Sequence, residues 1–163
     1  MQTQHNHKSH EMNHGKAMYL KLGLMTLLSF VAMYILMYAM VDKLDNVFFN
    51  INQFYMAALM TMPMIILELS VMGTMYKNKK LNGVLISSGA IGIVLFFLCI
   101  HHQVGVGDKQ FLKSMIPHHA AAVLMVEKSN VNDPEIKKLA EGIITSQQQE
   151  IEQMKKKIEE LEK

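Results

Sequence analysis

The sequence has no tryptophan and no arginine, because all sixteen of its basic residues are lysines. Arginine is the usual residue for bidentate recognition of phosphates and guanine bases, and the net charge is only +2. We therefore expect no nucleic-acid partner. A single cysteine, Cys99, excludes an internal disulfide framework. The chain also lacks a nucleotide-binding loop, a Ser or Cys triad and the paired Glu-x-x-His motifs of di-iron bundles, so we expect no enzyme.

What the chain does have is sixteen methionines and eight histidines, and thirteen of the methionines lie at or before Met75. Its composition changes along its length. Residues 18–100 are largely apolar, whereas residues 105–163 hold nine lysines and ten acidic residues. The sequence therefore predicts a His-rich tail (1–17), a membrane domain (18–104) and an extracytoplasmic metal-binding hairpin (105–163).

Three stretches are long and apolar enough to cross a bilayer as helices. Leu22–Val41 has twenty residues without a charge, and at about 1.5 Å per residue it spans a hydrocarbon core of roughly 30 Å. The second and third predicted spans are Phe54–Tyr76 and Leu81–Ile100. Lysines lie before the first span and between the second and third, at Lys77–Lys80. The positive-inside rule then predicts a cytoplasmic N-terminus and a periplasmic or extracellular C-terminal domain, in a multi-pass protein of a bacterial cytoplasmic membrane.

The C-terminal region predicts two helices joined by a short turn. Asp108 is the expected N-cap of the first helix, and Asp133-Pro134 predicts the start of the second. Apolar residues recur at helical spacing in the first helix at Phe111, Leu112, Met115, Ala122 and Met125, and in the second at Ile136, Ala140, Ile143, Ile151, Met154, Ile158 and Leu161. A hairpin of this size buries little apolar surface by itself. We therefore expect an all-α protein whose hairpin forms a homo-oligomer, such as a four-helix bundle.

One face of the first hairpin helix carries soft metal ligands. Met115, His118 and Met125 fall within an arc of about 80°, and His119 lies about 40° to the other side of Met115. Thioether and imidazole ligands select Cu(I) or Ag(I). The second helix offers Met154 as a further ligand, and Gln147 or Glu150 as partners that orient an imidazole. The alternative is that these methionines are ordinary packing residues.

Two motifs in these helices resemble a known family. Ser-Met-Ile-Pro-His-His at 114–119 is followed by Ala-Val-Leu-Met at 122–125, and the second helix contains Gln-Gln-Gln-Glu-Ile-Glu-Gln-Met at 147–154. This pattern, from Gly107 to Leu161, resembles the domain of unknown function 305 family with its CopM-like members. The resemblance implies a ferritin-like helical bundle that binds copper and supports copper resistance. Transferred residue by residue, it implicates Met115, His118, His119, Met125 and Met154, and it leaves open which histidine ligates.

Three further groups are candidate secondary sites. A flexible polar tail that could capture metal contains His5, His7, His10, Met12 and His14, while the outer end of the third span contains Cys99, His101 and His102. The second span carries Met60, Met64, Glu68 and Met72 on one face. These four residues could line a path across the bilayer, but ordinary apolar packing is the favoured explanation of the membrane methionines. Glu68 is expected near the bilayer centre, with a hydrogen-bond donor from Ser87, Ser88 or Tyr34.

These features lead to three functional hypotheses. The first is a membrane-anchored protein that sequesters or hands on Cu(I) in copper homeostasis. The second is an oligomeric copper transporter that uses the methionines and Glu68 of the second span. The third is a metal-free structural anchor.

Overall fold

The computed structural model describes the backbone of residues 2–163 and the side chains from Gly15 onward. Within this range the chain is all-α, and no strand is present. The chain divides into two compact units. Unit 1 comprises Met1–Met33 with Tyr55–His102, and unit 2 comprises Tyr34–Phe54 with Gln103–Lys163.

Three helices are long and apolar enough to cross a membrane. The helix α1 (Gln2–Leu36) continues into the short 3-10 helix η1 (Met37–Met40), and α2 (Ile51–Val71) and α3 (Lys79–His101) follow. The corresponding candidate spans are Gly15–Met40, Ile51–Val71 and Lys79–His101. The prediction of three apolar helices is thus confirmed, and this is compatible with a membrane protein.

Two boundaries differ from expectation. The second span begins three residues earlier and ends five residues earlier than predicted, because the chain turns after Val71 at Gly73. The helix α1 also extends back to Gln2, so the N-terminal segment predicted as a flexible tail is helical in its backbone.

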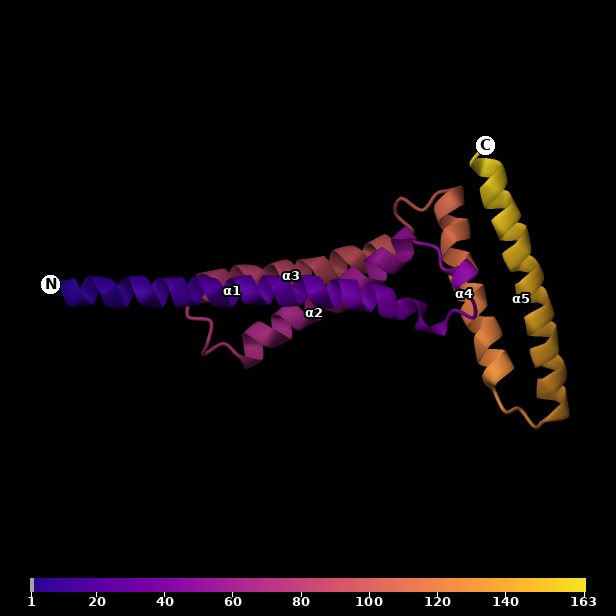
Figure 1. The fold of residues 1–163 in the computed structure, drawn as a ribbon, viewed down its shortest axis with the longest axis horizontal. Coiled ribbons are helices and arrows are strands. Elements are labelled where there is room, and N and C mark those ends of the chain that lie inside the picture. The colour runs from indigo at the N-terminus through magenta and orange to yellow at the C-terminus, as the bar shows by residue number, and fades with distance from the viewer. Residues whose placement is uncertain (1) are drawn as a thin grey trace. The chain divides into compact units, whose positions relative to one another are not determined.

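Helices α2 and α3 of unit 1 approach each other closely at two glycines. A Cβ atom on Gly89 would lie 3.0 Å from a side-chain carbon of Ile66, and one on Gly92 would lie 2.8 Å from the sulfur of Met62. Small residues at such positions allow membrane helices to pack by van der Waals contact. Leu22 of α1 is buried together with Leu69 of α2 and with Tyr76 in the following turn. Leu85 and Ile86 of α3 pack against this cluster, so all three helices contribute to one core. The three helices lie along one another in Figure 1.

Unit 2 consists of a helical hairpin and of the segment between α1 and α2, which we call the connector (residues 37–50). The connector contains η1 and a second 3-10 helix, η2 (Leu44–Asn46). Its Val41 and Phe48 pack against the core of the hairpin. The residue that follows the connector, Ile51, also contacts the hairpin, because its backbone N–H donates to Oε1 of Gln110 at 3.1 Å.

The hairpin itself pairs α4 (Asp108–Lys128) with α5 (Pro134–Leu161), which lie side by side in Figure 1. Asp133 caps α5 as predicted, since its Oδ1 accepts from the backbone N–H groups of Glu135 and Ile136 at 2.8 and 3.1 Å. Asp108 is not the N-cap of α4. That position belongs to Gly107, and Asp108 is the first helical residue, where its charge still favours the helix N-terminus.

Candidate metal centre

The buried face of α4 differs from the one that the sequence pattern predicts. Phe111 and Met125, expected inside, are each 51% exposed, whereas Ile116, Ala120 and Val123 are 0% exposed. The cause is the connector. The connector packs against the cluster that contains Ile116 and Ala120, so α4 contacts both the connector and α5. The buried face of α4 therefore lies between these two elements. This change in the buried face places His119, and not His118, in the interior.

His119 is the histidine that faces the interior. It is 7% exposed, and its Nδ1 lies 2.9 Å from the backbone oxygen of Met115, one turn earlier in α4. A carbonyl oxygen can only accept a hydrogen bond, so Nδ1 carries a hydrogen. A backbone carbonyl that holds one imidazole nitrogen in this way fixes the orientation of the ring and directs the other nitrogen to its partner.

The other nitrogen, Nε2, points toward α5 and Glu150. The distance from Nε2 to Oε2 of Glu150 is 2.7 Å. The second carboxylate oxygen, Oε1, accepts from the Ser146 hydroxyl at 2.6 Å. The Ser146 hydrogen bond and then the His119 hydrogen bond lower the pKa of the Glu150 carboxyl. Both oxygens of Glu150 are therefore held by donors, and the carboxylate is oriented at the imidazole from the facing helix.

Two thioethers flank this pair. Met115 is half-buried and lies one turn before His119 on α4. Met154 is half-buried, lies one turn after Glu150 on α5, and packs against the core cluster that contains Ile116 and Ala120. Met115 and Met154 thus each lie one helical turn from a member of the His119–Glu150 pair, on the two facing helices. An imidazole nitrogen, two sulfurs and a carboxylate form a donor set that suits a soft cation.

The remaining predicted ligands of the hairpin are not part of this group. His118 is exposed, with its ring centroid 6.1 Å from that of His119. Met125 is exposed as well. Gln147 is half-buried, and its Oε1 is buried without a hydrogen-bond partner among the described residues, so it does not orient an imidazole here.

The predicted secondary sites have separate outcomes. The His101 ring stacks on Phe97 at 5.7 Å and meets His102 edge-on at 5.8 Å, while Cys99 is half-buried. No cluster of three or more His, Cys, Asp or Glu side chains that could hold a metal occurs in the part of the chain with described side chains. The side chains of His5, His7, His10, Met12 and His14 lie outside the described part.

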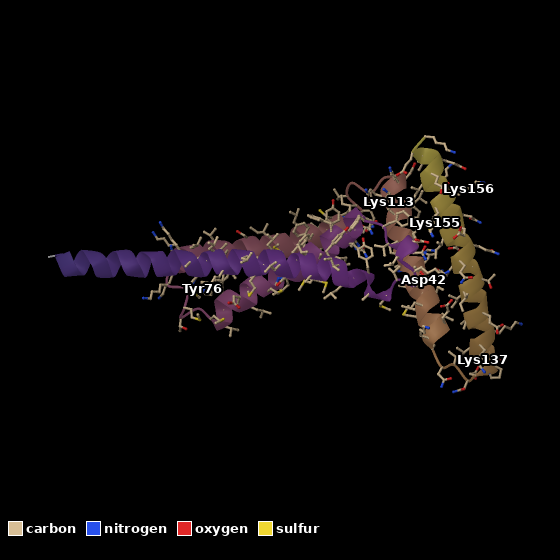
Figure 2. All side chains as sticks on the ribbon, viewed as in Figure 1. Asp42, Tyr76, Lys113, Lys137, Lys155 and Lys156 are labelled. Carbon is tan, nitrogen blue, oxygen red and sulfur yellow. The ribbon has the colours of Figure 1, made fainter. Side chains whose placement is uncertain are left out.

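Glu68 does not lie at the centre of its helix. It is three residues from the end of α2, on the side of the Lys77–Lys80 turn. Its hydrogen-bond donor is the hydroxyl of Tyr76, at 3.1 Å from Oε1, and not Ser87, Ser88 or Tyr34. Tyr76, at the turn between α2 and α3 in Figure 2, is itself buried. A carboxylate near a helix end has less desolvation to overcome than one at mid-membrane.

The methionines of the predicted second span do not face one interior path within this chain. Met60 and Met72 are exposed and Met64 is half-buried. The methionines that take part in helix packing are others. Met62 fills the space beside Gly92, and the sulfur of Met33 lies 3.6 Å from the Thr61 hydroxyl. Adaptable packing is a common role of methionine.

These features together define the class of the protein: an all-α chain with three helices that are long and apolar enough to span a membrane, followed by a hairpin with a buried, carboxylate-held histidine. The family model described as domain of unknown function 305 (DUF305) matches residues 70–158. The chain therefore belongs to this family. The matched region includes α3, so it begins earlier than the hairpin motifs alone indicated.

The chain is also similar to a viral protein. An uncharacterized protein of Acanthamoeba polyphaga mimivirus is 37% identical over 134 residues, which cover 80% of this chain and 86% of the relative. No solved structure matches the chain.

Proposed function

We propose that this protein binds a soft monovalent metal ion, Cu(I) foremost and Ag(I) by the same chemistry, at His119, Met115 and Met154 of the hairpin. In this proposal it sequesters the ion or hands it on without chemical turnover. The lysine distribution supports a location of this domain on the non-cytoplasmic side of a bacterial membrane.

The observation that carries the proposal is the geometry of His119. Its Nδ1–H is anchored by the carbonyl of Met115, which leaves Nε2 as the nitrogen directed toward α5. Imidazoles that bind metals are typically held in this way, with the second nitrogen donating to a carbonyl or carboxylate. Thioether sulfurs on both sides favour Cu(I) over zinc or hard cations.

Glu150 has a supporting role in this site. Its Oε2 accepts the hydrogen bond that Nε2 makes in this structure, and metal ligands must lose their protons to bind. When the ion takes the place of that proton, the carboxylate adjoins a positive charge instead of an imidazole N–H. The Ser146 hydroxyl keeps it in position on α5.

Adjacent histidines provide a matched test. We expect His119→Gln to weaken Cu(I) binding by at least about tenfold, since changes in a metal site of this kind typically cost 10–100-fold. His118→Gln, at an exposed position, should change it by less than about twofold. The measurement is an anaerobic competition titration of the full-length protein in detergent against a chromogenic Cu(I) chelator.

The two methionines are tested by Met115→Leu and Met154→Leu, which keep apolar volume and remove sulfur. X-ray absorption at the copper edge should show fewer sulfur neighbours in each variant. If copper affinity is equal in the wild type and in all three ligand variants, the metal site is wrong and the structural-anchor hypothesis gains support.

A further inference from the structure

The hairpin has one side that no other part of unit 2 covers. On α4 this side carries Met115, Ala122 and Val126, which lie roughly 90° from the centre of the buried face at 100° per residue. On α5 it carries Leu139 and Ile143. The hydrogen bond from His119 to Glu150 shows that these two flanks lie on the same side of the hairpin, because both residues point there. We call this surface the open face.

The opposite side of α4 is occupied by the connector. Gln110, on that side, accepts from the backbone of Ile51, and Pro117, also on that side, is buried. The open face has no such cover within unit 2, and Leu139 is 63% exposed there. A shallow groove follows α5 on this face, and Leu139, Gly142, Ile143 and Gln147 are among the residues that line it.

We infer that a second copy of this chain covers the open face, and that the copper site proposed above is closed by the partner copy. The inference on the site rests on the proposed function, whereas the inference on the pairing does not. In this arrangement two hairpins stack about a two-fold axis and form a four-helix bundle.

The size of the open face fits a second copy. The helix α5 has 28 residues and is therefore about 42 Å long, and two helices side by side are about 20 Å wide. The product, about 800 Å², is what one partner typically buries in a stable interface. Charge also permits self-association, because residues 105–163 hold nine lysines and ten acidic residues and are nearly neutral.

The position of the metal centre along the hairpin links pairing to binding. His119 lies at the middle of α4 (Asp108–Lys128), and Glu150 lies close to the middle of α5 (Pro134–Leu161). For two open faces to overlap over their full length, the two-fold axis must pass close to the midpoints of the hairpins, whether it runs along or across the helices. The two metal centres then adjoin at the axis, where the partner's open face excludes water and can supply a further thioether or imidazole.

The first experiment measures mass and copper binding separately. The full-length protein in detergent is analysed by light scattering with metal chelated, and its Cu(I) affinity is measured by competition. Leu139→Glu places a charge on the open face, while the control Gln148→Glu adds the same charge at an exposed position of α5 away from it. We expect a dimer for the wild type and the control, and a monomer with Cu(I) affinity at least about tenfold weaker for Leu139→Glu.

A crosslinking experiment tests the pairing without an interface-breaking charge. In a Cys99→Ser background, which removes the one native thiol, Ala122→Cys should give a crosslinked dimer in membranes with a short bifunctional maleimide. Gln148→Cys should not.

Each result decides a different part of the inference. A monomeric wild type with no crosslink at position 122 overturns the pairing. A dimeric wild type whose monomeric Leu139→Glu variant binds Cu(I) equally well overturns the shared site and leaves the proposed function intact. A dimer that binds no Cu(I) overturns the proposed function and with it the shared site, while the pairing stands.

Discussion

The core of the hairpin depends on Ile116, and its truncation is the sharpest test of how unit 2 is held together. Ile116 is 0% exposed and packs with Ala120, Ile151 and Ile158, and Val41 and Phe48 of the connector contact the same cluster. A substitution here should therefore weaken the contact between α4 and α5 and the contact of the connector with α4 together.

The expected magnitude follows from the atoms removed. Ile116→Ala deletes three carbon atoms, which at about 0.8 kcal/mol per buried methylene gives roughly 2.4 kcal/mol. The cavity left behind adds to this, so the total should fall between about 2 and 5 kcal/mol, whereas Ile116→Val should cost about 0.5–1.5 kcal/mol. The two variants form a graded series at one site.

The absence of native tryptophan provides the assay. A Phe48→Trp substitution gives a single tryptophan, on the connector, and its fluorescence reports the packing of the connector against the hairpin. Urea titrations of the full-length protein in detergent, followed by Trp fluorescence and by circular dichroism, give the free energy change for each variant. If Ile116→Ala costs less than about 1 kcal/mol, or if it leaves the fluorescence transition unchanged, then Ile116 does not anchor the connector to the hairpin.

Three further predictions follow from contacts in the two units. Ser146 and His119 lower the pKa of Glu150, and Lys109 lowers that of Glu162. Both carboxylates therefore stabilise the hairpin above their unfolded pKa of about 4.3, and this contribution is lost as pH falls through the lower folded values. Thermal stability of the wild type should decline below roughly pH 4, and a profile that stays level from pH 5 down to pH 2 would contradict this. Asp133→Ala removes the cap of α5 and should cost about 1 kcal/mol, with most of it recovered in Asp133→Asn. Gly89→Leu should lower the thermal stability of unit 1 in detergent, because its Cβ lies 3.0 Å from Ile66 and 3.4 Å from the backbone oxygen of Met62, whereas Gly83→Leu, with nothing within 4 Å, should not; equal effects at the two glycines would mean that α2 and α3 do not pack closely at Gly89.

The lysines of unit 2 illustrate a pattern that can be interpreted from sequence alone. Lys137, Lys155 and Lys156 lie along α5 in Figure 2, toward its two ends. Their clustering with glutamates along the helix is typical of a solvated face. One ion pair has a more specific place, since Nζ of Lys109 at the start of α4 lies 2.6 Å from Glu162 at the end of α5. Because this pair is largely exposed, its contribution to stability is small.

Features set by local chemistry were predictable from the sequence. The three apolar helices follow from length and hydropathy, and the boundary between α4 and α5 follows from Asp133 and Pro134, whose preferences are local. The motif around His118 and His119 likewise indicates the family through residue types and their spacing alone. These properties depend on neighbours within one or two turns, so one-dimensional patterns contain them.

Which of the adjacent histidines faces the interior was decided only by tertiary structure. The helical pattern of α4 has apolar residues on more than one side, and it predicted a buried face with Phe111 and Met125. The connector, which precedes α2 and α3 in the chain, packs on that helix and shifts the buried face to Ile116 and His119. The hydrogen-bond partner of Glu68 was likewise decided by tertiary structure. Because α2 ends at Val71, Tyr76 lies in the turn after the helix, and its hydroxyl donates to Glu68. Which residues of a helix are buried depends on every element that packs against it, and the sequence of the helix alone does not identify those elements.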